Sequence, residues 1–400
     1  MTTSHAVQHV YVAGIALTYP FVVTQFHISY AALGVVLTVA GVVGGVLQGA
    51  AGFIRRASAR ALLAAQNVLL AVASLAAAVA PGFAAYGAAR CFGSLVSWPQ
   101  HPVGSAYLSE RFPSRRGTVL SWHTSGGSLG TVVTPLAVAL MISTWGWRWA
   151  LVVLAVPMAA GGLLVGLRLP DDRRVPAPRG QGRDQAGATS WAQMAKVLAR
   201  PVAVLTLLAS TISAAGRGLG VIAAYVPAYL KSGLHLGTFE VGAVYTVIMV
   251  GGVVGPVIAG QISDRVGRLP VLLVSYLGGA AALVAFPLVG AELAALVVMA
   301  ALVGVLVYIE SPLLQALFSD AVAGLESRSA FGMFFAIAYG VGALWLAVIG
   351  YVIDQAGFQW AFFTMAASFV AAAGLVAPLR SMLRPAKAMP GSPPTEEEMR

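Results

Sequence analysis

Residues 260–268 read Gly-Gln-Ile-Ser-Asp-Arg-Val-Gly-Arg, and this short polar stretch separates two long apolar runs at 239–262 and 270–290. A helix crosses the hydrocarbon core of a bilayer with about 20 mostly apolar residues, so each run is long enough to span a membrane. The same alternation continues in both directions along the chain. It predicts spanning helices, because an open sheet edge in lipid would leave backbone polar groups unpaired.

The apolar runs account for most of the 400 residues. We count twelve, at 7–26, 30–53, 60–80, 84–107, 118–142, 149–169, 201–230, 239–262, 270–290, 293–318, 329–353 and 358–378. The chain is 58% hydrophobic and 10% charged, whereas about 25% of the residues in an ordinary soluble domain are charged. Composition therefore excludes a soluble enzyme and a disordered chain, and the single cysteine, Cys91, excludes a disulfide scaffold.

The basic residues predict the orientation of the chain. If both termini are cytoplasmic, the inner segments contain 20 of the 24 lysines and arginines, as the positive-inside rule requires. The net charge of +10 then reflects topology and contact with anionic lipid headgroups, not nucleic acid. We expect a monomeric, multi-pass protein of the inner (plasma) membrane.

A polar stretch at 170–200 divides the runs into six and six, and related sequence blocks recur in the two halves. Residues 27–34 parallel 235–242 at an offset of 208, and residues 146–150 parallel 357–361 at an offset of 211. Parallel six-span repeats are typical of transporters with a binding site between the halves. The predicted fold is an all-α membrane protein with two pseudo-symmetric six-helix bundles around a central cavity.

The expected organisation has four parts. These are an N-terminal bundle at 1–169, a cytoplasmic linker with a short amphipathic helix at 170–200, a C-terminal bundle at 201–379, and a disordered cytoplasmic tail at 380–400.

Placed between two spans, residues 260–268 resemble the signature loop of the major facilitator superfamily. The resemblance implies twelve helices, alternating access and a gating role for this loop, in which the aspartate helps to latch the outward-open state. The matching residues are Gly260, Asp264, Arg265, Gly267 and Arg268. The first-half copy at 52–60 has Arg56 where an aspartate is expected, and it ends at Arg60. Either Asp264 is the latch alone, or Arg56 pairs with an acid such as Glu326, or these arginines only set topology.

Within the superfamily, the N-terminal half resembles the fosmidomycin-resistance type of exporter. The resemblance rests on His5, His9 and Tyr11, on ISYAALGVVLTV at 28–39, and on short blocks at 90–93, 101–102, 115–117 and 126–130. It implies proton-coupled export by antiport. His9 departs from the pattern, because an acid is expected there.

Three charged residues fall well inside the apolar runs, and such residues are functional candidates because charge is costly in a bilayer. Arg217 either binds the carboxylate or phosphonate of a solute or is the structural partner of Glu310. Glu310 is a proton carrier, half of a fixed ion pair with Arg217, or a water-facing group. Arg90 resembles the span 4 arginine of proton-linked exporters, or it reaches the outer headgroups.

Histidines and tyrosines supply the remaining candidates. His9 is a coupling candidate at the position where an acid is expected. His101 and His123 suit proton relay because histidine titrates near neutral pH, and the alternative for each is a structural hydrogen-bonding role. Tyr11, Tyr225 and Tyr308 offer hydroxyls to a solute or simply pack. We find no pair of His, Cys, Asp or Glu with metal-site spacing and no phosphate-binding loop, so we expect no metal, no cofactor and no enzyme activity.

The sequence thus predicts a secondary transporter for a small organic solute, anionic or amphiphilic, that works by alternating access with protons, and export is favoured. Proton-linked uptake or exchange of a carboxylate is the alternative within transport. A solute sensor or scaffold without turnover is the alternative from another class.

Overall fold

The computed structural model describes residues 1–50, 58–170, 191–325 and 327–382, and these residues are helical, with no strand among them. The first half contains α1 (Thr2–Ala16), α2 (Tyr19–Phe26), α3 (Tyr30–Ala50), α4 (Ala59–Ala78), α5 (Phe83–Ser97), α6 (Gln100–Arg111), α7 (Arg116–Trp145) and α8 (Trp147–Arg168). The second contains α9 (Trp191–Leu198), α10 (Pro201–Ile212), α11 (Ala223–Ala228), α12 (Thr238–Val266), α13 (Arg268–Ala285), α14 (Leu293–Val307), α15 (Glu310–Ala321), α16 (Ser327–Phe334), α17 (Leu344–Ala356), α18 (Phe358–Val376) and α19 (Leu379–Met382).

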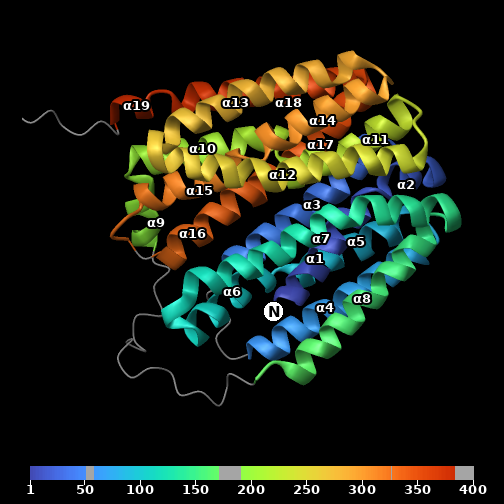
Figure 1. Ribbon diagram of the computed structural model, residues 1–400, viewed down its shortest axis with the longest axis horizontal. Helices are drawn as coiled ribbons and strands as arrows, with labels where there is room; N and C mark the ends of the chain where they lie inside the picture. Colours follow the sequence, from blue (N-terminus) through green and yellow to red (C-terminus); the bar gives the residue numbers. More distant parts are fainter. Residues whose placement is uncertain (51–57, 171–190, 326, 383–400) are drawn as a thin grey trace, which may run out of the picture.

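The helices form two groups that follow the order of the sequence. Figure 1 shows α1–α8, in blue to green, on one side and α10–α18, in yellow-green to red, on the other. The groups lie close together at the end that carries α2 and α11, and they separate toward the end that carries α6 and α9.

Among the described residues, ten helical stretches are long and apolar enough to cross a membrane, and α1 with α2, bent by 42°, would be an eleventh if the pair is counted as one span. The predicted run at 84–107 corresponds to two helices, α5 and α6, which are separated by a turn at Trp98 and Pro99. Neither helix is long enough alone, and α6 is too polar to extend the apolar run of α5. The count of twelve spans therefore stays a prediction, whereas a polytopic all-helical membrane fold is confirmed. A helix also lies where the linker was expected to have one, at α9.

The predicted seventh span is broken in its middle. It consists of α10, the 3₁₀ turn η4 (Ser213–Gly216), the π-helical turn η5 (Gly218–Ile222), α11 and the π-helical turn η6 (Tyr229–Gly233). Arg217, between η4 and η5, has an extended backbone with φ −63° and ψ 132°. Glycine is required next to it, because a Cβ on Gly218 would lie 2.4 Å from the Tyr308 ring. Irregular backbone at membrane depth is tolerated where it is buried in protein or lines a cavity.

Hydrogen bonds join the two halves at their closed end. The carboxylate of Asp354, in α17, accepts from the backbone N–H groups of Tyr30 and Ala31 at 3.0 and 2.7 Å, which lie in the first turn of α3. About two turns further along α3, the Thr38 hydroxyl donates to the carbonyl of Ala343 at 2.9 Å. These contacts hold α3 against the second half.

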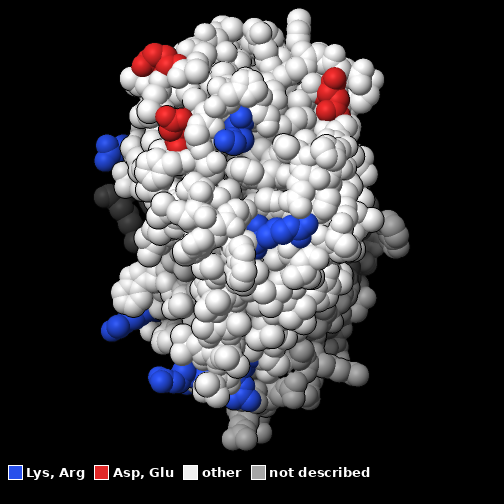
Figure 2. All heavy atoms as spheres, turned by 90° about the vertical axis from the view of Figure 1, so that its right-hand side faces the viewer, with Lys and Arg blue, Asp and Glu red and all other residues white. Residues whose placement is uncertain are grey.

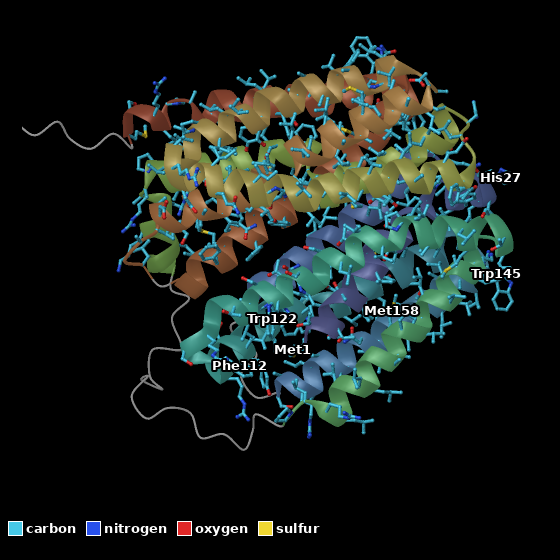
Figure 3. The ribbon with its side chains drawn as sticks, viewed as in Figure 1. Met1, His27, Phe112, Trp122, Trp145 and Met158 are labelled. Atoms are coloured by element: carbon cyan, nitrogen blue, oxygen red, sulfur yellow. The ribbon has the colours of Figure 1, made fainter. Side chains whose placement is uncertain are left out.

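The side chains at the two ends differ in character. Figure 3 shows His27 and Trp145 at the closed end, and Phe112 and Trp122 toward the other. Trp145 is 61% exposed, as expected of an aromatic side chain at a membrane interface. Figure 2 looks onto the closed end and shows only scattered charged side chains separated by uncharged surface.

Matched positions of the repeated blocks have the same unusual backbone. His27 and His235, 208 residues apart, are both left-handed, with φ 49° and 57°. Gly146 and Gly357, 211 residues apart, have φ 82° and 88°. The relation of the halves stays a prediction, and these angles agree with it.

Candidate functional site

A cavity of about 850 Å³ lies between the two halves and is lined by residues from both. This volume suits a small organic molecule. Six of the predicted binding residues line the cavity: His9, Arg90, His101, Arg217, Tyr308 and Glu310. The other three, Tyr11, His123 and Tyr225, are buried behind the wall, with exposed fractions of 1–2%.

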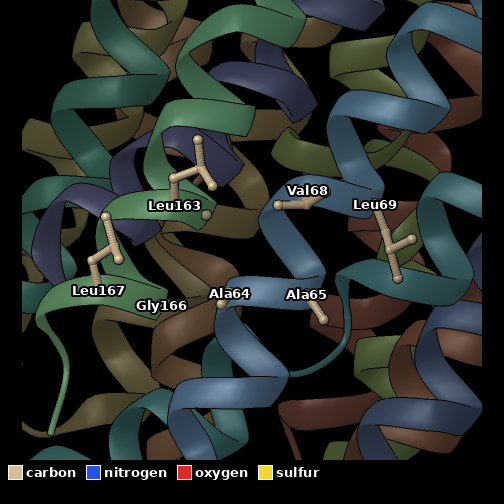
Figure 4. A pocket seen from close by; sticks show the side chains of 8 residues that line it. Ala64, Ala65, Val68, Leu69, Leu163, Gly166 and Leu167 are labelled. Carbon is tan, nitrogen blue, oxygen red and sulfur yellow. The ribbon is translucent and has the colours of Figure 1, made fainter.

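A second, apolar hollow lies between α4 and α8. It has a volume of about 420 Å³ and is lined by alanine, valine, leucine and glycine residues, among them Val68 and Leu163 (Figure 4). Leu163 and Leu167 are 63% and 81% exposed, so this hollow lies on the outer surface. It offers no polar group to orient a solute, and the central cavity is the better candidate site.

Arg217 and Glu310 form a buried ion pair in the wall of the second half. Nε of Arg217 donates to Oε1 of Glu310 at 3.1 Å, and the side chains are 9% and 0% exposed. The unwound backbone at Arg217 lets the guanidinium reach the helix that begins at Glu310. Its Nη1 donates to the carbonyl of Ala338 at 2.7 Å, and its Nη2 donates to both oxygens of Ser210. The guanidinium is thus surrounded by acceptors, of which Glu310 alone carries charge.

Further hydrogen bonds extend from this ion pair toward the solute space. The Ser213 hydroxyl donates to Oε2 of Glu310 at 2.7 Å, and the Arg217 guanidinium lies 4.5 Å from the centre of the Tyr339 ring. The Tyr339 hydroxyl is 2.6 Å from the Ser311 hydroxyl, on the cavity wall. The ion pair therefore lies next to Tyr339 and Ser311, which line the cavity.

Arg90, in the wall of the first half, has a different environment. Its Nε donates to the Tyr19 hydroxyl at 3.1 Å, its Nη1 donates to the Ser94 hydroxyl at 3.2 Å, and its guanidinium lies 5.9 Å from the Tyr11 ring centre. Among the described side chains, no carboxylate forms an ion pair with Arg90. The first 169 residues contain a single acid, the exposed Glu110. The cavity wall therefore presents one cation whose charge is not neutralised.

Four histidines from three helices meet in the first half, and we call them the histidine cluster: His5, His9, His101 and His123. The His5 ring stacks on His123 at 4.3 Å and meets His9 and His101 edge-on at 4.6 and 5.0 Å. His5 was not among the predicted binding residues. The exclusion of metal-site spacing was also wrong, because His5 and His9 lie four residues apart on one helix face.

The loop at 260–268 connects two helices at the separated end. α12 ends at Val266, Gly267 follows with φ 91°, and α13 begins at Arg268, whose guanidinium pairs with Asp320. Asp264 and Arg265 are exposed, and Gly260 is half-buried. Arg60, of the first-half copy, is the second residue of α4. The predicted partners Arg56 and Glu326 lie outside the described residues.

Several polar residues that the sequence reading missed complete the two walls. In the second half, Ser210 and Ser213 form hydrogen bonds with the ion pair. Tyr276 donates to Ser213, and the Tyr339 ring lies against the Arg217 guanidinium. In the first half, Gln100 accepts from Ser4 and Gln66 at 2.9 and 3.1 Å, close behind the histidine cluster. Polar residues inside apolar runs were the available signal, because each needs a buried partner.

Comparison with known proteins gives one family. A curated relative, the "Uncharacterized MFS-type transporter YfnC" of Bacillus subtilis (strain 168), is 25% identical over 283 residues, which are 70% of this chain and 67% of the relative. The fold is similar to the nucleoside transporter NupG (D323A mutant), with TM-score 0.76, 17% identity and coverage of 96% of this chain and 98% of that one. A D-xylose-proton symporter gives TM-score 0.72, 16% identity and coverage of 94% and 96%.

The family profile of the "Major Facilitator Superfamily" matches residues 2–345 and 206–399. The resemblance found in residues 260–268 is thereby confirmed, and with it a multi-pass membrane protein that carries out transport. The chain belongs to the Major Facilitator Superfamily.

Proposed function

We propose that this transporter moves a small organic anion, or an amphiphile with an anionic head, by transport that is coupled to protons and runs in the direction of export. The observation that carries the proposal is Arg90, a cation on the cavity wall that no described carboxylate neutralises. Arginine remains charged at any physiological pH and binds carboxylates and phosphonates bidentately.

The charge balance of the cavity supports an anion over a cation. Its charged lining residues are Arg90, Arg217 and Glu310, and the last two form an ion pair. One positive charge is left over in a site largely removed from water, where a counter-charge is worth more than in bulk solvent. Apolar lining residues, such as Leu37 and Phe335, provide room for the rest of an amphiphile.

The ion pair supplies a means of coupling to protons. Protonation of Glu310 would leave Arg217 without its charged partner, and a solute anion could then take the place of the carboxylate. Release of the proton would restore the ion pair and expel the anion. The proton and the anion would then be bound together and released together, so their movements are coupled through the Arg217–Glu310 pair.

The arrangement of the halves supports alternating access by rigid-body motion. We infer that bundles 1–169 and 201–379 rock about the cavity, with both termini and the linker 170–200 in the cytoplasm of a bacterial inner membrane. On this topology the closed end faces outward, and Asp354 and Thr38 seal it.

The test is transport by purified protein in liposomes under an imposed pH gradient. Phosphonates, carboxylates and anionic amphiphiles are added in turn, and proton flux and solute flux are both followed. Arg90→Gln should abolish transport of the anion and Arg90→Lys should retain part of it. Arg380→Gln, which alters an exposed arginine of α19 away from the cavity, should leave the flux unchanged.

Glu310→Gln separates the solute site from proton coupling. We expect solute-driven proton flux to vanish in this variant while Arg90-dependent binding persists. Equal anion transport by Arg90→Gln and the native protein would contradict the anion proposal. Uptake that supports growth on a carboxylate, in place of protection by efflux, would reverse the direction.

A further inference from the structure

The histidine cluster places three metal-ligating groups close together on the wall of the first half. His5 and His9 lie one turn apart in α1, and His101 lies at the start of α6. One ring nitrogen from each lies within 4.8 Å of the other two. Three neutral imidazoles around one ion would hold their nitrogens about 3.4 Å apart, given zinc–nitrogen bonds of about 2.1 Å. Small side-chain rotations would therefore bring the three groups to binding distance.

The hydrogen bonds of His5 leave its outer nitrogen available. Nδ1 of His5 lies 2.7 Å from the backbone carbonyl of His123, which can only accept, so Nδ1 carries the proton. Nε2 of His5 then has the lone pair, and it is buried without a hydrogen-bond partner. A Cβ on Gly127 would lie 2.8 Å from this ring, so the glycine makes room for it.

The hydrogen bonds of His9 have the same effect. The Thr131 hydroxyl donates its one proton to the carbonyl of Gly127 at 3.0 Å, and its oxygen is 2.8 Å from Nδ1 of His9. In this arrangement the oxygen accepts from Nδ1–H, and the lone pair of His9 is again on Nε2. An imidazole whose second nitrogen donates to a fixed oxygen is the arrangement that orients histidine ligands in metal sites.

The chemistry of these donors selects the class of ion. Neutral imidazole suits zinc, nickel, cobalt and copper, whereas magnesium and calcium require oxygen ligands. No acidic residue of the first half other than the exposed Glu110 is present among residues 1–169, so oxygen ligation by carboxylates does not arise there. His9 and His101 line the cavity, which gives an ion a path of entry and leaves one coordination position open.

We propose that His5, His9 and His101 bind a divalent transition-metal ion, such as zinc, on the cavity wall of the first half. This site is separate from the Arg217–Glu310 pair and does not depend on the identity of the transported solute. Thr131 is a positioning residue, because it acts on the ion through His9.

The experiment is metal titration of the full-length protein in detergent, purified with an affinity tag that contains no histidine. Zinc binding is measured by calorimetry, and cobalt binding by the visible absorption of a low-symmetry cobalt site. We expect one ion per chain, no displacement by a large excess of magnesium, and at least 100-fold weaker binding in His9→Gln and in His101→Gln. Thr131→Val should weaken binding by about 10–100-fold, as loss of a group that orients a ligand does.

The control is the double variant His27→Asn, His235→Asn, which removes the two histidines outside the cluster. Both positions have left-handed backbone, which asparagine tolerates. Figure 3 places His27 at the closed end, far along the molecule from Met1. Unchanged affinity in this control, with loss in the cluster variants, supports the proposal. Equal zinc affinity in His101→Gln and the native protein, or no zinc binding by well-folded native protein, would overturn it.

Discussion

The buried ion pair predicts that a second mutation will restore stability lost through the first. In Glu310→Gln, the amide is nearly isosteric with the carboxylate and still accepts a hydrogen bond, so the loss is mainly electrostatic. Unit charges 3.1 Å apart interact by about 5 kcal/mol at an effective dielectric constant of about 20. Removing one partner of a buried pair costs about 3–5 kcal/mol. Arg217 keeps its three uncharged acceptors, which places the expected loss near 3 kcal/mol.

Arg217→Gln should cost less than Glu310→Gln, because a buried carboxyl can take up a proton whereas a guanidinium cannot lose one. The double variant leaves no charge at this site. It should therefore be more stable than Glu310→Gln alone, with a coupling free energy of about 2–3 kcal/mol between the two positions.

The assay is thermal unfolding of the four proteins in one detergent, followed by tryptophan fluorescence. We expect a drop in Tm on the order of 5–10 °C for Glu310→Gln and a smaller drop for the double variant. Glu110→Gln, at an exposed position, is the matched control and should shift Tm very little. A double variant whose loss equals the sum of the single losses would refute the view that the two charges stabilise one another.

Three further outcomes follow from individual contacts. Gly218→Ala should lower the stability of the protein by about 1–3 kcal/mol, since the new Cβ would overlap the Tyr308 ring. Gly374→Ala in α18 has open space around it and should be neutral or slightly stabilising. Thermal unfolding of the two variants compares these effects. Asp354→Ala removes the acceptor for two N–H groups of α3, a loss of about 1 kcal/mol. The equilibrium between closed and open forms of this end should therefore shift about fivefold toward the open form. Distances between spin labels on α3 and α17 would measure the shift, and an unchanged distance distribution would contradict it. Arg268→Gln breaks the ion pair with Asp320, whose two side chains are 34% and 58% exposed. The loss of stability should therefore stay below about 1 kcal/mol. A larger loss in the same unfolding assay would mean that the pair is shielded from solvent in the membrane.

The fold could be predicted largely from hydrophobic run length, because lipid forces the backbone to satisfy its own hydrogen bonds. The run at 201–230 could not be read as a broken helix, since it is long and mostly apolar and Arg217, in Gly-Arg-Gly at 216–218, is its only charged residue. Whether that tripeptide unwinds depends on Glu310 and Tyr308, which are about 90 residues away in sequence. The first span was placed at 7–26, but its helix begins at Thr2, because the polar residues Ser4, His5 and Gln8 are buried inside the protein and need not avoid the membrane.

The sequence identified site residues most clearly where a charged residue lies inside an apolar run, because charge is rare in a bilayer. Arg90, Arg217 and Glu310 were found in this way, and all three line the cavity. Tyr11, His123 and Tyr225 do not line it, because the rotation of a helix is set by packing that a single sequence does not reveal. The spacing of His5 and His9 was available in the sequence, but their approach to His101 required the tertiary structure.

The unequal walls of the cavity have a consequence for how such a protein can evolve. The wall of the second half is a closed hydrogen-bonded network in which each change disturbs a buried charge. Across the cavity, Arg90 and the histidines are held by uncharged partners, and few of their contacts are shared with the opposite half. After a gene duplication, we expect selection for new substrates to act first on the wall of the first half, while the second half preserves the capacity to fold. Substrate range and stability would then be inherited through different parts of the same gene.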